Sequence, residues 1–307
     1  MMNTISRLQS FDLGRFSISI TLLMFAILIG CTAPIDIKTD DSPPVIVIYG
    51  AVTNEFTHHK IMISRSAPYF DNKPNEGISG AKVAVQSSNN ETYTFREHDT
   101  IPGMYLSNRK FSAQSGVDYS LSVEVDFDND GIMDKYEAAT TILPPTSVDS
   151  LTIEPTTMFG RKNYLLYLHF QDPPEKNHYL VNVIYNDSLL NAKLSRYIIS
   201  DDKIFDGQAG KMMIFRFYEE QEQETDTEGI REYSVSLYPG DTVITETCTI
   251  TKEYFDFIDQ CQKEQGGEVP IFGGPAANIA TNISNGGLGF FTGYCIFRNM
   301  VIHKQEN

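Results

Sequence analysis

The sequence predicts a mainly β protein made of two β-sandwich domains, the second of which carries one packed α-helix. Three observations lead to this expectation. Short segments that alternate apolar and polar residues recur along the chain, as strands buried on one face require. Prolines, glycines and Asp-Gly or Asn-Gly pairs separate these segments, which is typical of turns. One stretch near residue 255 has the apolar spacing of a helix.

The first 30 residues have the features of an export signal. Arg7 and Arg15 precede an apolar run at residues 16–30. A helix that spans a membrane needs about 20 residues, and this run is shorter. Its length is typical of the core of a signal peptide. It leads into Leu-Ile-Gly-Cys at residues 28–31, which resembles the lipobox of bacterial lipoproteins. The resemblance implies cleavage before Cys31 and acylation of its sulfur, and several acyl chains on one residue anchor a protein stably. The alternative is an ordinary buried cysteine.

Residues 31–44 are polar and rich in proline, and we interpret them as the lipidated cysteine followed by a flexible tether. At about 3.3 Å per extended residue, this tether would hold the folded part clear of a membrane. Its acidic residues Asp36, Asp40 and Asp41 resemble the surface-export signal of Bacteroidota lipoproteins. The resemblance favours a location at the cell surface.

The first sandwich is expected over residues 45–145. Seven segments there have strand character: 45–52, 60–64, 81–86, 92–96, 103–107, 119–125 and 136–142. Their order resembles that of the transthyretin-like or carboxypeptidase-regulatory sandwich. Pro144 and Pro145 follow the last segment and cannot continue a strand ladder. We therefore expect the domain boundary there.

A calcium-like loop joins the last two of these segments. Its acidic side chains recur at the spacing of an EF-hand loop, with Gly131 at the turn. The segments on either side have strand periodicity, so the helices of an EF-hand are excluded. We expect a β-hairpin whose connection binds calcium in a structural role. The predicted ligands are Asp126, Asp128, Asp130, Asp134, Glu137 and the carbonyl of Ile132. The alternative is an acidic, solvated hairpin turn.

The second domain is expected over residues 146–307. Its strand-like segments are 164–170, 179–185, 211–218 and 233–238, with a final strand at 290–294. Between them, Thr251 is expected to cap a helix that reaches about residue 264. Tyr254, Ile258 and Cys261 form its apolar stripe. The acidic run at 219–228 is interpreted as a solvated hairpin tip.

Charge and cysteine content restrict the function further. The formal net charge of −16 disfavours nucleic acids and anionic surfaces as partners, because these require basic patches. Cys248, Cys261 and Cys295 form no metal or redox motif. We expect them to be buried free thiols, although one disulfide is an alternative.

No catalytic residues are expected. The sequence contains no zinc-protease, nucleophile-elbow, phosphate-loop or dinucleotide motif. The adjacent His58 and His59 would face opposite sides of a strand, which disfavours a shared metal ion. Asp201, Asp202 and Asp206 could serve as paired carboxylates for glycoside hydrolysis, but their spacing with Gly207 indicates a turn.

Several longer segments resemble one family. They are residues 49–54, 63–70, 201–208, 251–258 and 278–294, taken together with the tetrapeptide at 28–31. They are similar to Bacteroidota outer-membrane lipoproteins catalogued as a domain of unknown function. The resemblance implies a lipid anchor in the outer membrane and a gene beside a TonB-dependent receptor. It supplies no catalytic residues. The calcium-like loop departs from the family pattern.

These observations favour one functional class and leave two alternatives. The favoured class is a lipoprotein anchored in the outer membrane that acts, without catalysis, as a ligand-binding or accessory component of a TonB-dependent receptor. One alternative is a surface hydrolase of glycans or peptides that uses carboxylates assembled by the fold. The other is an adhesive or scaffolding β-sandwich protein, for which a calcium-ordered hairpin would be suitable.

Overall fold

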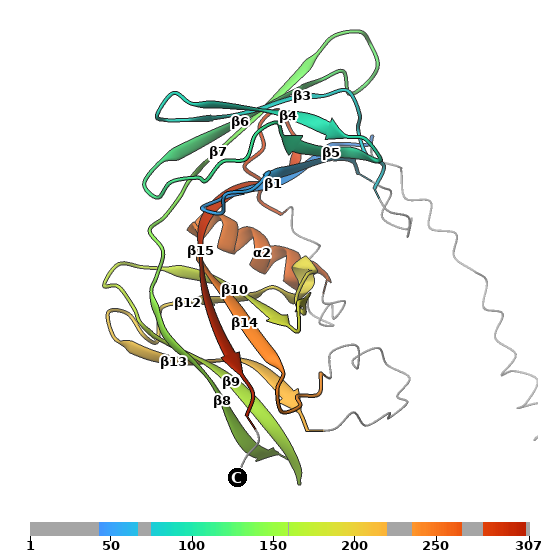
Figure 1. The fold of residues 1–307 in the computed structure, drawn as a ribbon. Coiled ribbons are helices and arrows are strands. Elements are labelled where there is room, and N and C mark those ends of the chain that lie inside the picture. Colours follow the sequence, from blue (N-terminus) through green and yellow to red (C-terminus); the bar gives the residue numbers. More distant parts are fainter. Residues whose placement is uncertain (1–42, 67–74, 159, 220–234, 266–278, 305–307) are drawn as a thin grey trace, which may run out of the picture. The chain divides into compact units, whose positions relative to one another are not determined.

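The structure is a computed structural model that describes residues 43–66, 75–158, 160–219, 235–265 and 279–304 (Figure 1). Residues 43–307 form one compact unit, separate from residues 1–42. The predicted signal peptide, Cys31 and most of the tether therefore lie outside the described residues. Among the described residues, no helix combines the length and the apolar character that a membrane crossing requires.

The mainly β fold with one packed helix is confirmed. The first seven strands lie close to their predicted positions: β1 (Ile46–Thr53), β2 (Lys60–Arg65), β3 (Lys82–Ser87), β4 (Thr92–His98), β5 (Ile101–Ser107), β6 (Asp118–Val125) and β7 (Asp134–Thr141). Their residues alternate between buried and exposed, so one face of each strand supplies the core. The register of β6 and β7 confirms the predicted hairpin, in which residues 126–133 make the connection.

The second half contributes eight strands: β8 (Val148–Met158), β9 (Arg161–Gln171), β10 (His178–Tyr185), β11 (Ser188–Leu189), β12 (Ile198–Asp201), β13 (Ala209–Tyr218), β14 (Thr242–Thr249) and β15 (Leu288–Ile302). Of these, β8, β11, β12 and β14 were not predicted. The predicted strand at 233–238 has a different outcome. Its first two residues lie outside the described part, and Ser236 makes only an isolated bridge to Tyr218. All but the first residue of the acidic run at 219–228 also lies outside the described residues.

Most strands belong to one sheet with the order β11-β10-β14-β15-β1-β2-β5-β4-β3-β6-β7, and β12 also pairs with β10. Strand β15 lies between β14 and β1, so it joins the strands of the second half of the chain to those of the first half. Residues 288–294 pair in parallel with β1, and residues 295–302 pair antiparallel with β14 (Figure 1). The parallel approach is close at Gly289, which has a φ of +99°. A Cβ there would lie 2.1 Å from the carbonyl oxygen of Ile48, so this position requires glycine.

The last strand of this sheet, β7, also approaches β15. Asn282 donates from Nδ2 to the carbonyl oxygens of Ala139, at 3.2 Å, and of Phe291, at 2.7 Å. Ser284 accepts a hydrogen bond from the backbone N–H of Glu137 at 2.7 Å. The sheet thus curls around a first core that contains residues from β1 to β7 together with Phe291 of β15.

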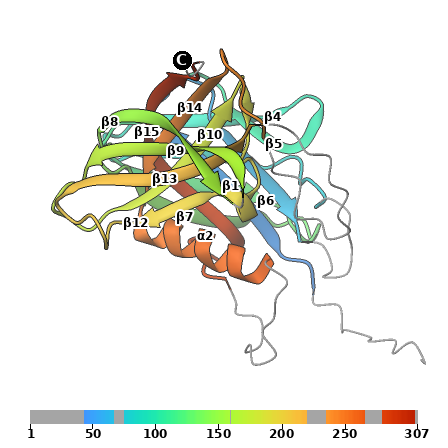
Figure 2. The ribbon, with the colours of Figure 1, turned by 90° about the horizontal axis from the view of Figure 1, so that it is seen from below.

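Strands β13, β9 and β8 form a separate three-stranded sheet in that order. Its inner face packs on β10, β14 and the second half of β15, and Figure 2 shows β9 lying across these strands. Leu166, Leu168 and Phe217 from this sheet meet Val181 and Val243 in a second core. The two sheets therefore form a sandwich.

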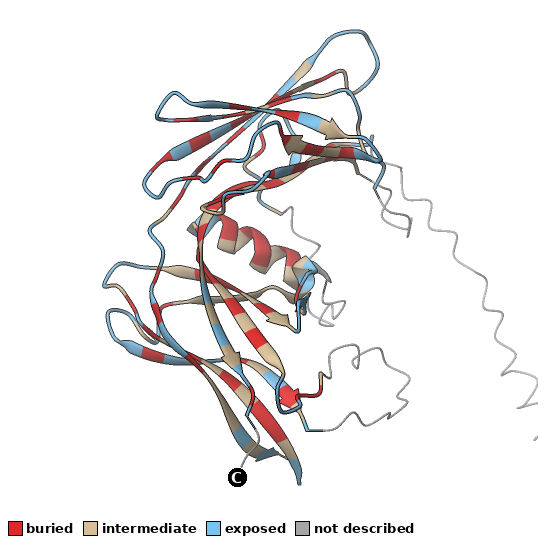
Figure 3. Cartoon of the chain, viewed as in Figure 1, coloured by how far each residue is buried: buried red, intermediate tan, exposed pale blue. Residues whose placement is uncertain are grey.

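The helix α2 (Lys252–Gln265) covers the opposite face of β10 and β15. Thr251 caps it as predicted, because its Oγ1 accepts a hydrogen bond from the backbone N–H of Tyr254 at 3.3 Å. The predicted stripe of Tyr254, Ile258 and Cys261 is buried against the sheet (Figure 3). The helix therefore belongs to a third core.

The predicted domain boundary at residues 145 and 146 stays a prediction. It falls between β7 and β8. Strand β15, from beyond this boundary, supplies Phe291 and Cys295 to the first core, and Phe297 and Val301 pack against the second. A division of the chain at this point would therefore separate the first core from the β15 side chains that belong to it.

Candidate functional site

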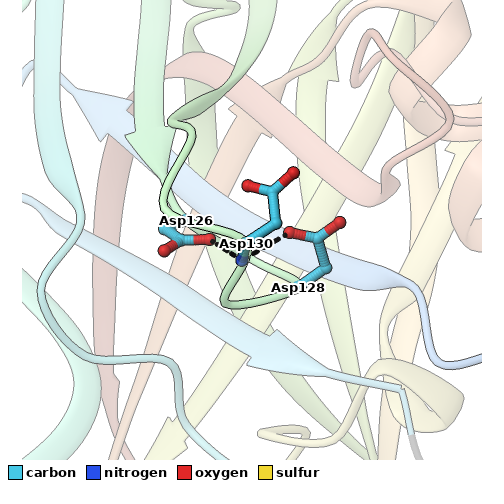
Figure 4. Close-up of side chains that lie close together, drawn as sticks. All are labelled: Asp126, Asp128 and Asp130. Atoms are coloured by element: carbon cyan, nitrogen blue, oxygen red, sulfur yellow. Dashed lines mark hydrogen bonds between the residues drawn. The ribbon is translucent and has the colours of Figure 1, made fainter.

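The calcium-like loop brings three of the predicted ligands together. Oxygens of Asp126, Asp128 and Asp130 all lie within 4.8 Å of one another (Figure 4). The backbone N–H of Asp130 donates to Asp126 Oδ1 at 3.1 Å and to Asp128 Oδ1 at 3.2 Å. Asn129 and Gly131 have positive φ values of 62° and 86°, which curl the backbone around these carboxylates.

The other predicted ligands lie outside this group of three. Asp134 begins β7, and its Oδ2 accepts a hydrogen bond from Phe127 N at 3.3 Å. Glu137 lies further along β7 and forms a 2.6 Å ion pair with Lys135. The backbone N–H of Ile132 donates to Asp130 Oδ1 at 2.7 Å. The ligand roles of Ile132, Asp134 and Glu137 stay predictions.

The fold assembles a second group of carboxylates that the sequence identified only in part. Oxygens of Asp172, Asp202 and Asp206 lie within 4.8 Å of one another. Asp201, which the sequence placed with the last two, instead pairs with Lys203, and this hydrogen bond lowers the pKa of Asp201. Asp172 follows β9 and lies 30 positions or more from its partners, so no local spacing could reveal it.

Two of these three carboxylates are buried and already hydrogen-bonded. Asp172 is 2% exposed and Asp202 is 5% exposed. The hydroxyl of Tyr179 and the backbone N–H of Gly207, at 3.1 Å, donate to Asp172. Burial raises the pKa of Tyr179, and the carboxylate of Asp172 raises it further. The backbone N–H of Asn177 donates to Asp202. These contacts give both buried carboxylates hydrogen-bond partners and stabilise this end of the sandwich.

The histidine and cysteine candidates have structural contacts. His58 Nδ1 lies 2.7 Å from the carbonyl oxygen of Ser107, and His59 Nε2 lies 3.0 Å from that of Phe111, so the two rings have different partners. The three cysteines from Cys248 onward are free and buried, as expected. Burial raises the pKa of Cys261 to about 11, which disfavours the reactive thiolate.

A hollow of about 580 Å³ lies on the outward face of β3, β6 and β7. Its floor contains Ala84, Ser120, Ser122 and Ala139. Further lining comes from Gln86, Thr92, Lys135 and Glu137. The sequence did not predict this feature, because small polar residues at alternate strand positions look the same on any solvated sheet face.

Among the solved structures that match this chain are two bacterial enzymes with only remote similarity. The β-glucuronidase of Parabacteroides merdae is 8% identical with a TM-score of 0.23, and the match covers 68% of this chain and 23% of that one. For β-glucuronidase 3 of Bacteroides uniformis, the identity is 9%, the TM-score is 0.21, and the coverage is 67% and 23%. The chain thus spans about a quarter of the length of these enzymes.

The curated proteins contain no match to this sequence. A family match, in contrast, covers most of the chain. Residues 32–298 match the family described as "Domain of unknown function (DUF4249)". This range includes every described strand except the last residues of β15. The protein therefore belongs to the DUF4249 family.

Proposed function

We propose that this protein is a lipoprotein anchored in the outer membrane that binds a ligand, or assists a TonB-dependent receptor, without catalysing a reaction. The observation that carries the proposal is the tetrapeptide at residues 28–31, which ends in Cys31 directly after an apolar run. Acyl chains on this cysteine would anchor the compact unit of residues 43–307 without a spanning helix.

The chemistry of the described residues supports a role other than catalysis. Hydrolysis by paired carboxylates requires both groups to reach the substrate. In the group of Asp172, Asp202 and Asp206, the first two carboxylates are buried and only Asp206 is exposed. The described cysteines are buried thiols with raised pKa values. These groups are therefore poorly placed to act as nucleophiles or acids.

The anchor can be tested by mass spectrometry of the mature protein from outer membranes. We expect a lipid-modified Cys31 at the amino terminus. The Cys31→Ala variant should leave the membrane fraction, whereas the neighbouring Thr32→Ala variant should remain in it. A mature terminus at any other residue, or a Cys31→Ala protein that stays membrane-bound, contradicts the anchor.

Partnership with a receptor needs a separate experiment. Affinity purification of the tagged protein from detergent-solubilised outer membranes should recover a TonB-dependent receptor in comparable amount. Binding of the receptor should survive high salt if apolar contacts dominate the interface. Repeated recovery of the protein alone, from cells that express the neighbouring receptor, contradicts the partnership.

We also propose that the β6–β7 loop binds calcium in a structural role. Carboxylates about 4 Å apart repel one another by about 1 kcal/mol per pair even in water, and a bound cation would reverse this effect for Asp126, Asp128 and Asp130. Titration calorimetry should detect binding at up to millimolar calcium, and the double variant Asp128→Ala, Asp130→Ala should abolish it. The variant Asp99→Ala, at an exposed acid of another turn, is the matched control. Heat that is unchanged in the double variant would exclude the site.

A further inference from the structure

The hollow on the outward face of β3, β6 and β7 has the volume of a ligand site. Its volume of about 580 Å³ is within the range of about 300–1,000 Å³ that is usual for ligand pockets. We propose that it binds a neutral saccharide chain. This proposal extends the ligand-binding role proposed above by assigning a site and a class of ligand.

The register explains why this face is hollow. Ser122 of β6 lies opposite Ala84 of β3 and Glu137 of β7, while Ser120 lies opposite Gln86 and Ala139. Four small side chains therefore occupy neighbouring positions on three strands, and longer side chains border them. A saccharide chain that lies on this floor could contact the protein backbone closely, because no large side chain separates the two.

The polar groups of the hollow are available to a ligand. No hydrogen bond within the described part of the chain uses the side chains of Gln86, Thr92, Ser120 or Ser122. Together they offer one amide and three hydroxyls, each of which can donate and accept. Vicinal hydroxyls of a sugar ring have the same dual character. The methyl groups of Ala84 and Ala139 can contact the apolar C–H face of the ring.

Charge favours a neutral ligand over an anion. The hollow contains one cation, Lys135, and its ammonium already forms a 2.6 Å ion pair with Glu137. The remaining lining is uncharged. Since the whole chain has a net charge of −16, an acidic polysaccharide or a phosphorylated ligand would be repelled at longer range.

The sheet topology disfavours an extended peptide. A peptide that adds a strand needs a free backbone edge. Strand β3 pairs with β4 and β6, and β6 pairs with β3 and β7. The far side of β7 is bonded by Ser284 and Asn282. A peptide on this face could not add a strand to the sheet, so it would lack the backbone hydrogen bonds of strand addition. A saccharide does not depend on such bonds.

The test uses the full-length protein in detergent and four probes: maltohexaose, laminarihexaose, xylohexaose and a mannan hexasaccharide. We expect calorimetry to show binding of at least one. The variant Ser122→Trp, which fills the floor at a position that tolerates large β-forming residues, should weaken this binding by about tenfold or more. The matched control Thr157→Trp lies on an exposed position of β8 and should bind as the wild type does.

A second readout uses the absence of tryptophan from the natural sequence. In the variant Thr92→Trp, the single indole stands at the border of the hollow, so its fluorescence should change when the saccharide is added. The fluorescence of Thr157→Trp should not change. This measurement remains informative even if Ser122→Trp fails to fold.

Two results would overturn the proposal: no binding of any probe at millimolar concentration, or undiminished binding by a folded Ser122→Trp variant. Each of these results leaves the lipid anchor and the receptor partnership untouched, because those are measured by mass spectrometry and affinity purification. Failure of the saccharide site is therefore distinguishable from failure of the proposed function.

Discussion

At the scale of single residues, three asparagine side chains form hydrogen bonds to strand backbones that a neighbouring strand would otherwise form. Asn54 accepts from Ile296 N at 2.8 Å and donates to Ile296 O at 3.2 Å. Asn282 makes the same pair of bonds to Phe291, at 2.9 and 2.7 Å. Asn191 accepts from Val183 N and donates to Val181 O. A side-chain amide offers the same donor and acceptor as a peptide unit, so it satisfies backbone groups where no strand is available.

We expect Asn282→Ala to lower the free energy of unfolding by about 2 kcal/mol, because the N–H and C=O of Phe291 in a buried region would lose their partner. Urea denaturation measures the change. Asn108→Ala, which removes an exposed hydrogen bond to Thr94, is the control and should cost about 0.5 kcal/mol or less. Equal costs for the two variants would contradict the ladder role of Asn282.

His59 makes stability depend on pH. It is 4% exposed and packs against Phe111 at a ring distance of 4.2 Å. Burial lowers its pKa from the ordinary value of 6.5, although the hydrogen bond to the Phe111 carbonyl opposes this. Well above pH 6.5 the ring is neutral in both folded and unfolded states. As the pH falls below this value, the unfolded chain binds a proton first, so the free energy of unfolding decreases.

The measurement is urea denaturation at about pH 7.5 and about pH 5. The wild type should lose more stability over this interval than His59→Gln, whose side chain cannot be protonated. His98→Gln, at the partly exposed end of β4, is the control and should retain the loss seen in the wild type. Parallel losses in wild type and His59→Gln would exclude His59 as the cause.

At the scale of elements, the cap of α2 determines where the helix begins. We expect Thr251→Ala to lower the free energy of unfolding by about 1 kcal/mol, since Tyr254 N loses the Oγ1 acceptor. Thr251→Ser keeps this oxygen and should remain close to the wild type. Thermal unfolding followed by circular dichroism compares the three proteins. A serine variant as unstable as the alanine variant would show that the methyl group, and not the cap, matters.

Elements with a strong local pattern were predictable, and the others were not. In β6 and β7, strict alternation fixes which residues are buried, and the predicted bounds agree with the structure to within two residues. Strand β8 contains Pro155, which three consecutive residues of intermediate exposure precede, so its alternation is weak. It is a strand because it lies at the edge of the three-stranded sheet, where proline is tolerated.

At the scale of the whole molecule, β15 makes the first core depend on the C-terminal half. Phe291, Cys295 and Ile283 belong to that core. We therefore expect a fragment of residues 45–145 to lack a cooperative thermal transition, because it loses these side chains and the strand paired with β1. The fragment 45–307 is the control and should unfold cooperatively. A sharp transition in the shorter fragment would instead support an independent first domain.

The sequence by itself determined the features that depend on near neighbours in the chain. These are the strand faces of β1 to β7, the capped helix α2 and the loop that gathers Asp126, Asp128 and Asp130 within five residues. Only the tertiary structure decided which distant segments meet. It placed Asp172 beside Asp202, joined β15 to both β1 and β14, and aligned Ala84, Ser122 and Ala139 into a hollow. The physical reason is that local pattern fixes the face a side chain occupies, whereas its neighbour across the sheet depends on strand order and register, which are set by the packing of the whole core.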